Sequence, residues 1–322
     1  MTVFATAEQV RHVVQAAGLA PSVHNTQPWR FVRHPDRLDL MAEPSRQLAV
    51  LDPDGRQLHL SCGAALLHAR VAARALGLDV AVALLPDPGR PSHLASLSLT
   101  QGAAGTDDEV RLATAILHRH THRGAFDVRP VPPLLVDLLR QAASDEGARL
   151  VEVTDEDQLI ALEVLLSRAD GYEEADDAYR DELKQWVHVD IPTPEGIPTD
   201  AVELVPGSSL TQRAFGAPRP APPDAPFPER PAVVVLVTDD DAPESWLRAG
   251  QALALVLLRA ADHGVQAQPL GQVTDVLAYR LGLREALGIV GLPQLVLRMG
   301  YAIGVARTPR RSVRDVLTAV TD

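Results

Sequence analysis

Cysteine and lysine are almost absent from this chain of 322 residues, which contains one of each, Cys62 and Lys184. A single thiol forms neither an intrachain disulfide nor a four-thiolate metal site, and a buried core cysteine is the simplest interpretation of Cys62. Lys184 has no glycine-rich context, so the sequence indicates no Walker-type phosphate loop. Anion recognition must therefore fall to arginine, whose planar guanidinium suits phosphate.

Long apolar runs and net positive charge are also missing. The longest apolar runs, Ala252–Leu258 and Ala232–Val237, fall far short of the roughly 20 residues that a membrane span requires. Residues 1–11 lack the pattern of a signal peptide, so we expect a cytoplasmic location. The formal net charge of -12 argues against nucleic acid and anionic membranes as partners, because both require a positive face.

Several catalytic signatures do not occur. The nearest approach to a dinucleotide-binding Gly-x-Gly-x-x-Gly is Gly282, Gly288 and Gly291, which have the wrong spacing and lead into Pro293. Gly-x-Ser-x-Gly and His-Glu-x-x-His are absent as well. A Rossmann dehydrogenase, a hydrolase elbow and a zincin are therefore disfavoured.

What the chain does have is a globular composition, with 46% apolar and 22% charged residues, and enough length for two domains. Residues 7–19 show the period of an amphipathic helix. Residues 29–32 and 37–41 alternate like a pair of short strands. A helix over residues 54–78 and a strand over 79–85 follow.

The second half repeats part of this order. The segment from Gly63 to Gly77 can be laid over the segment from Gly250 to Gly264, and in both the second glycine comes fourteen positions after the first. Each segment follows predicted strands and leads into an extended apolar stretch. Matched neighbours on both sides favour duplication and fusion over a coincidence of helix length.

Residues 192–231 differ in kind, because they hold eleven of the 26 prolines. Such a segment forms neither helix nor central strand. A loose linker and a lid both fit. A pure spacer has no need of apolar residues, and this segment contains, among others, Leu204, Val205, Leu210, Phe215 and Phe227.

Two polar segments are candidates for ligand binding. Residues 22–27 hold five polar side chains between a predicted helix and a predicted strand, and they suit either the polar edge of a planar ligand or a structural turn. Arg119, Thr121 and Arg123 alternate, so in an extended segment they project to one side. Together they offer charge-assisted hydrogen bonds to a phosphate, each worth about 1.5–3 kcal/mol; the alternative is a solvated basic stretch.

Two further clusters are open to more than one interpretation. His118, His120 and His122 have the spacing of a zinc or copper site in a strand. Asp127 is the only carboxylate close by, so histidines in solvent or beside a ligand are favoured. Arg310 and Arg311 either add positive charge to the same anion or lie at the surface.

With these residues in view, the chain resembles the nitroreductase superfamily. Residues 20–31, Ala-Pro-Ser-Val-His-Asn-Thr-Gln-Pro-Trp-Arg-Phe, are similar to its Pro-Ser-x-x-Asn-x-Gln-Pro-Trp signature. Residues 119–126 resemble its phosphate motif, Arg-x-Ser-x-Arg/Lys, with threonine in place of serine. Residues 268–272 resemble the loop beside the flavin ring, with Gly-Gln where the family has Glu-Gly, and Arg310 matches the closing arginine of the phosphate site.

The order of the motifs resembles the internally duplicated, Acg-type branch of that superfamily, in which one polypeptide mimics the usual homodimer. The resemblance implies an α+β fold of two tandem nitroreductase-like halves, residues 1–108 and 109–322, with residues 192–231 as lid or linker. Each half would hold a mixed, mainly antiparallel sheet flanked by helices. The chain would be a monomer built as a pseudo-dimer, with further association open.

The resemblance also implies FMN as the cofactor. Arg119, Thr121, Arg123 and Arg310 would hold the phosphate and ribityl chain, the loop at 21–25 would meet the ring, and residues 269–272 would approach its far edge. The expected cofactor-binding set is Pro21, Ser22, His24, Asn25, Arg119, His120, Thr121, Arg123, Pro269, Leu270, Gly271, Gln272, Arg310 and Arg311. We expect no metal and no catalytic side chain, because the flavin carries the chemistry.

The implied function is an FMN-dependent oxidoreductase that passes electrons from NAD(P)H to a nitroaromatic, a quinone or a similar acceptor. A flavin-storage protein with little turnover, in which a lid covers the flavin, is the alternative from another class. A metal-binding protein with a histidine site is the third candidate.

Overall fold

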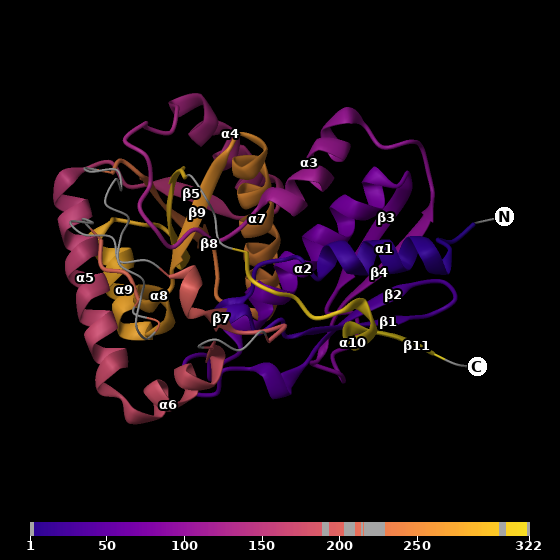
Figure 1. The fold of residues 1–322 in the computed structure, drawn as a ribbon, viewed down its shortest axis with the longest axis horizontal. Coiled ribbons are helices and arrows are strands. Elements are labelled where there is room, and N and C mark those ends of the chain that lie inside the picture. The colour runs from indigo at the N-terminus through magenta and orange to yellow at the C-terminus, as the bar shows by residue number, and fades with distance from the viewer. Residues whose placement is uncertain are drawn as a thin grey trace.

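Two β-sheets lie on either side of a central pair of long helices (Figure 1). This computed structural model describes residues 3–188, 193–202, 210–213, 215, 229–302 and 307–320. The first sheet has the order β11-β1-β2-β4-β3. Its strands are β1 (Trp29–Arg33), β2 (Leu38–Ala42), β3 (Leu78–Leu84), β4 (His93–Gln101) and β11 (Leu317–Ala319).

The second sheet is antiparallel throughout, in the order β5-β8-β10-β9. Its strands are β5 (Arg149–Glu152), β8 (Ala232–Thr238), β9 (Val265–Leu270) and β10 (Leu292–Tyr301). The first sheet is antiparallel except for the parallel pair β1 and β11. The predicted α+β fold with mixed, mainly antiparallel sheets is therefore confirmed.

Helices cover both sheets. The longer ones are α1 (Ala7–Ala17), α2 (Arg56–Ala75), α3 (Asp107–His118), α4 (Pro133–Asp145), α5 (Glu156–Ala175), α6 (Asp177–Trp186), α7 (Pro243–Asp262) and α9 (Leu277–Ala286). Two single turns, α8 (Gln272–Asp275) and α10 (Val313–Val316), complete the set in the described parts. The side chains of Thr6 and Thr106 form capping boxes that start α1 and α3.

The predicted periodicities are confirmed in these elements. Helix α1 buries Val10, Val13, Val14 and Ala17 on one face, as the spacing of its apolar residues requires. Gly77 follows α2, and Gly264 follows α7, with φ values of 73° and 74° that favour glycine. Cys62 is buried in α2, where its thiol donates to the carbonyl of Pro28.

Helices α2 and α7 cross where Gly63 faces Gly250. A Cβ atom on Gly63 would overlap the carbonyl oxygen of Leu247, and a Cβ atom on Gly250 would overlap that of Leu60. Each glycine therefore contacts the residue that lies three positions before the glycine of the partner helix. The contact is the same in both directions, as at an interface with two-fold symmetry. One turn earlier on each helix, His59 and Trp246 also face each other, with ring centroids 5.6 Å apart.

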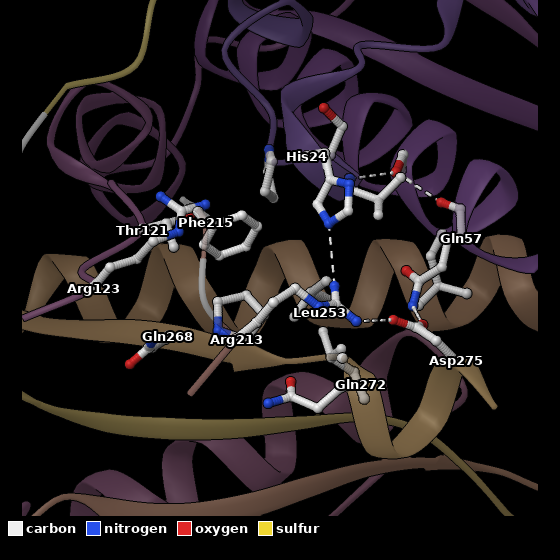
Figure 2. Close-up of a pocket in the computed structure, with 18 residues that line it drawn as sticks. His24, Gln57, Thr121, Arg123, Arg213, Phe215, Leu253, Gln268, Gln272 and Asp275 are labelled. Carbon is white, nitrogen blue, oxygen red and sulfur yellow. Dashed lines mark hydrogen bonds and ion pairs between the residues drawn. The ribbon is translucent and has the colours of Figure 1, made fainter. Parts of the chain in front are cut away.

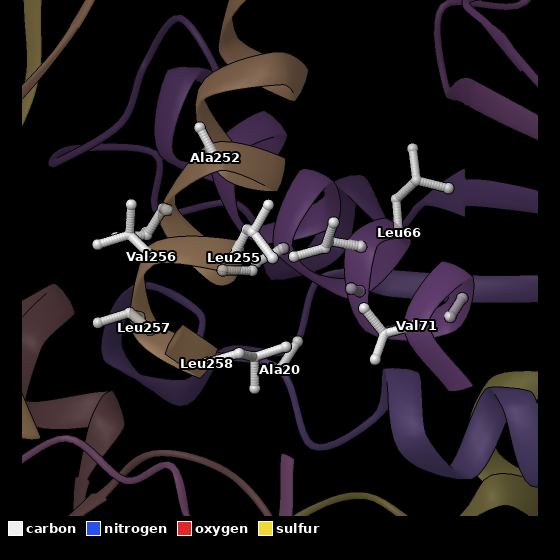
Figure 3. Close-up of a cluster of buried hydrophobic side chains, with 14 of the residues drawn as sticks. Ala20, Leu66, Val71, Ala252, Leu255, Val256, Leu257 and Leu258 are labelled. Atoms are coloured by element: carbon white, nitrogen blue, oxygen red, sulfur yellow. The ribbon is translucent and has the colours of Figure 1, made fainter. Parts of the chain in front are cut away.

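The main hydrophobic core lies around this helix pair. Leu66 and Val71 of α2 and Leu255 and Leu258 of α7 all belong to this core (Figure 3). A second, smaller core lies on the other face of the second sheet, beneath α5 and α9. The two cores fix the helix pair relative to both sheets, and this positions the residues considered below.

The C-terminal segment returns to the first half of the chain. Strand β11 pairs in parallel with β1, and α10 packs against α1. The first sheet is therefore completed by residues 317–319, beyond the predicted boundary at residue 108, and the division into halves stays a prediction. Within the described ranges, no helix has the length and apolar character needed to cross a membrane.

Within residues 193–202, strand β7 (Ile197–Pro198) pairs in parallel with β6 (Val187–His188), which follows α6. Of the apolar residues named in the proline-rich segment, Leu210 and Phe215 are buried. Leu204, Val205 and Phe227 lie outside the described residues.

Candidate functional site

The loop between α1 and β1 has an unusual backbone. His24, Asn25 and Gln27 have φ values of 44°, 55° and 50°, in the left-handed region that non-glycine residues seldom adopt. Two side chains hold it in this form: the backbone N–H of Gln27 donates to Ser22 Oγ (3.0 Å), and the N–H of Val23 donates to Ser61 Oγ on α2 (3.1 Å). A strained loop fixed in this way presents its side chains in one direction.

The C-terminal segment braces this loop from behind. Gln27 Oε1 accepts from the backbone N–H of Arg311 at 2.8 Å, and the Arg311 guanidinium donates to Gln27 O and to Glu43. Asn25 Nδ2 donates to the carbonyls of Gly196 and Pro309, at 3.0 and 3.1 Å. Asn25 and Arg311 therefore hold the loop, and neither lines the cavity in front of it.

That cavity lies between the loop, the helix pair and the end of β9 (Figure 2). The empty space between its walls is about 780 Å³, open solvent at the mouth included. Of the residues predicted to bind the cofactor, eight line it: Pro21, Ser22, His24, Thr121, Arg123, Pro269, Gly271 and Gln272. The segments around residues 22 and 121 thus share one cavity, as predicted. Leu270 turns away into the smaller core.

Three arginines form a cationic cluster beside this cavity: Arg123 lines it, and Arg119 and Arg310 line a neighbouring cavity. Burial and the charges of Arg310 and Arg123 lower the pKa of Arg119 to about 9. Burial and Arg310 lower the pKa of Arg123 to about 10, and burial lowers that of Arg310 to about 10. Neighbouring guanidinium groups lower one another's pKa because their positive charges repel. The lowered pKa values therefore indicate a concentration of positive charge here.

No carboxylate in the described part of the chain pairs with this cluster. Arg119 donates to Leu19 O, and Arg310 donates to Thr308 and Pro309. Arg119 Nε, Arg123 Nη1 and Arg310 Nε are buried without a hydrogen-bond partner in the same residues. Because buried charges are normally paired, these three side chains indicate a missing anion.

His120 lies on the outer side of this cluster. It lines a neighbouring cavity with Arg119, Arg307 and Arg310 and does not line the main one. Burial and the charges of Arg119, Arg307 and Arg310 lower the pKa of His120 to about 4. Nowhere in the described ranges do three or more potential metal-ligating side chains gather, those of His118, His120 and His122 included.

The opposite end of the cavity holds a buried ion-pair network. Arg213 Nη2 lies 2.9 Å from both carboxylate oxygens of Glu173 and 3.0 Å from Asp275 Oδ2. Asp275 Oδ1 also accepts from Arg56 (3.1 Å) and Gln57 (2.5 Å). These arginines have carboxylate partners, unlike those of the cationic cluster.

An aromatic side chain lies between the two ends. The Phe215 ring is 5.4 Å from the guanidinium carbon of Arg123 and 5.6 Å from the His24 ring (Figure 2). Arg213 and Phe215 both belong to the proline-rich segment, so that segment forms part of the cavity wall.

Sequence reasoning missed several lining residues: Gln57, Leu60, Ser61, Arg213, Leu253, Asp275 and Leu295. A signal existed for two of them, because Gln57 and Ser61 are polar residues one turn apart on a helix rich in alanine and leucine. Arg213 offered a weaker signal, as a cation close to a buried aromatic residue. Nothing local marks the others.

The fold and the site define a class of protein. The Nitroreductase family model matches residues 116–304, and the chain belongs to this family. The expected family is thereby confirmed.

Among its relatives, the chain is similar to "Putative NAD(P)H nitroreductase Rv3131" of Mycobacterium tuberculosis, at 35% identity over 98% of this chain and 93% of that protein. It is 33% identical to "Putative NAD(P)H nitroreductase acg" of the same organism, over 97% of this chain and 96% of that one. The expected likeness to Acg is confirmed. A solved structure, a nitroreductase with bound FMN from Desulfitobacterium hafniense, overlaps with a TM-score of 0.42 at 14% identity, over 66% of this chain and 98% of its own, and this partial overlap decides nothing about the site.

Proposed function

We propose that this chain binds FMN in the main cavity and is an FMN-dependent oxidoreductase. The observation that carries the proposal is the cationic cluster of Arg119, Arg123 and Arg310, which has no carboxylate partner in the described residues and reaches the main cavity through Arg123. A phosphate monoester, with a charge of about −1.5 to −2, would satisfy it.

The residues present fit the rest of such a ligand. The Thr121 side chain is near the cluster, and Leu60, Leu253 and Leu295 give the cavity apolar walls. His24 Nδ1 and Gln268 Oε1 are buried there without partners in the described chain, so a donor and an acceptor remain for a polar ring edge. Pro269, Gly271 and Gln272 line the same cavity as the loop at 21–24.

When bound, FMN supplies hydride and electron transfer between a nicotinamide and an acceptor. The protein's own residues bind and orient it, and Arg123 places positive charge beside it, which favours a ring that gains electrons. The names of the relatives support NAD(P)H as donor. We propose a nitroaromatic, a quinone or a similar small molecule as acceptor.

Flavin storage is the second candidate, and the position of the proline-rich segment favours it. Arg213 and Phe215 lie in the cavity wall, and the carboxylates of Glu173 and Asp275 anchor Arg213 there. A segment held in this way would act as a lid that limits access by a nicotinamide.

We further propose that the chain arose by duplication, acts in the cytoplasm and is a monomer with one FMN. The reciprocal contact of Gly63 and Gly250 supports duplication. So does the packing of α4 against α7, which matches that of α1 against α2.

The visible spectrum of the purified protein tests the cofactor, because oxidised FMN gives the protein a yellow colour. Anaerobic addition of NADPH then separates the two functions. Rapid bleaching supports the oxidoreductase, whereas bleaching by dithionite alone supports storage. A colourless protein that takes up no added FMN would overturn both.

A further inference from the structure

His24 lines the cavity, and one nitrogen of its imidazole ring already has a partner in the protein. Its Nε2 lies 3.1 Å from Nη1 of Arg213, as Figure 2 shows. The side chain is only 6% exposed, and its backbone is in the left-handed conformation at φ 44°. The imidazole is therefore fixed from both sides, by its own loop and by Arg213.

The contact with Arg213 determines where the proton of His24 lies. A guanidinium has only donors, so Nε2 must accept and cannot carry a hydrogen. Burial and the charges of Arg213 and Arg123 hold the pKa of His24 well below its usual value, so the ring is neutral. A neutral imidazole that accepts at Nε2 carries its hydrogen on Nδ1.

Arg213 is itself held too firmly to turn away. Both oxygens of Glu173 and one of Asp275 accept from Nη2, and the Tyr179 ring lies 5.8 Å from the guanidinium carbon. Burial alone would lower the pKa of Arg213, but the carboxylates outweigh it and raise the pKa. Moving Arg213 would leave two buried carboxylates without this partner, which is costly.

The other ring nitrogen, Nδ1, has no acceptor for its hydrogen among the described residues. Nδ1 of His24 is buried and has no hydrogen-bond partner in the described residues, although His24 lines the cavity. A buried donor without an acceptor costs about 1–3 kcal/mol. The cost is removed if a molecule in the cavity supplies the acceptor.

We propose that Arg213 is a positioning residue that locks His24 in the Nδ1–H tautomer, and that this N–H donates to a hydrogen-bond acceptor of the ligand. The proposal rests on the proposed function in one respect: if the ligand is FMN, the acceptor is a carbonyl oxygen or ring nitrogen of the flavin's polar edge.

The first test uses the protein without flavin. Nitrogen-15 NMR of the imidazole groups distinguishes the two neutral tautomers, and a His24→Asn variant assigns the resonances. We expect Nδ1–H for His24 in the wild type and in Arg213→Lys, which keeps a donor. Arg213→Met should shift the population towards Nε2–H.

Arg70→Met is the matched control. Arg70 also joins a carboxylate, that of Glu146 at 2.6 Å, but it does not line the cavity. Its variant should leave the His24 tautomer unchanged. A wild-type His24 with its proton on Nε2 would overturn the proposal even if Arg213→Met failed to fold.

The second test adds FMN and measures its midpoint potential. His24→Ala removes the donor, and we expect it to weaken binding of reduced relative to oxidised flavin about tenfold, a shift of roughly 30 mV for a two-electron couple. Asn tolerates the left-handed backbone and retains an N–H, so His24→Asn should recover most of the shift.

The two proposals fail differently. If FMN binds but the Nδ1–H resonance of His24 does not move, the donor role is wrong while the proposed function stands. If no flavin binds, the proposed function is wrong, and the flavin is not the hydrogen-bond acceptor for His24. The first test still decides whether Arg213 fixes the tautomer of His24.

Discussion

Arg119, Arg123 and Arg310 differ from the other buried arginines in what surrounds them. Arg56 and Arg213 have carboxylates within about 3 Å, whereas these three have backbone carbonyls, a threonine hydroxyl and each other. The chain has a net charge of -12 and is rich in carboxylates, yet none of those in the described ranges pairs with this cluster. Charge of this kind is stable when an anion completes it.

Loss of one arginine should weaken FMN binding more than it weakens folding. Arg123→Ala removes a charge-assisted contact to the phosphate worth about 1.5–3 kcal/mol, so we expect the Kd for FMN to rise by roughly 10- to 150-fold. Fluorescence titration measures it. The exposed Arg90 provides the matched control, and Arg90→Ala should bind FMN as the wild type does. Full flavin occupancy in Arg123→Ala would show that the phosphate site is misplaced.

His68 makes the stability of the protein depend on pH. Burial and the neighbouring Arg119 lower its pKa from 6.5 to about 3. Between these values the unfolded chain binds the extra proton, so acidification through this window reduces the free energy of unfolding. In His68→Gln, the slope of unfolding free energy against pH should be shallower by about 1.4 kcal/mol per unit near pH 5. Denaturant unfolding at several pH values measures this, and an unchanged slope would contradict it.

At the scale of elements, the crossing of α2 and α7 depends on two residues without side chains. In Gly63→Ala or Gly250→Ala, the new methyl group would meet backbone of the partner helix, so we expect a loss of about 1–3 kcal/mol or more in stability. Gly171 is the control, because no atom lies within 4 Å of a Cβ placed there on α5. Gly171→Ala should be neutral or stabilise by about 0.5–1 kcal/mol. Thermal unfolding of the three variants compares them, and an equal effect at Gly63 and Gly171 would contradict the close approach.

Elements with a strong period could be predicted from the sequence, and long-range pairings could not. The apolar stripe of α1 is a local pattern and is confirmed. The two short strands are confirmed as β1 and β2, but β2 is buried along its whole length and not on alternate residues. The parallel pairing of β11 with β1 joins residues 317 and 31, and no local pattern encodes it. In the site, motif residues such as Ser22 and Arg123 were identified, whereas Arg213 reaches the cavity only through tertiary packing of a proline-rich segment.

At the scale of the whole molecule, the helix pairs α1–α2 and α4–α7 pack alike, but the connections that follow α1 and α4 differ. Eleven residues, 18–28, connect α1 to β1, while only residues 146–148 connect α4 to β5. At the connection between α4 and β5, the Arg70 guanidinium donates to Glu146 and to Gln251, at 2.6 and 2.8 Å. The loop that lines the main cavity therefore has no counterpart of similar length after α4.

This asymmetry predicts one flavin for each chain. Native mass spectrometry of the FMN complex, together with the absorbance ratio of flavin to protein, measures the stoichiometry. We expect a single FMN in a chain of 34.6 kDa. Two flavins in one chain would mean that the shorter connection builds a second site.

We propose that the arginine cluster binds the phosphate of FMN and that the loop at 21–24 contacts the attached flavin ring. Parallel titrations of the flavin-free protein with FMN and with riboflavin, which lacks the phosphate, test it most directly. We expect FMN to bind at least about tenfold more tightly, and we expect Arg123→Ala to abolish most of that preference. Equal affinity for the two flavins, or no affinity for either, would contradict the account.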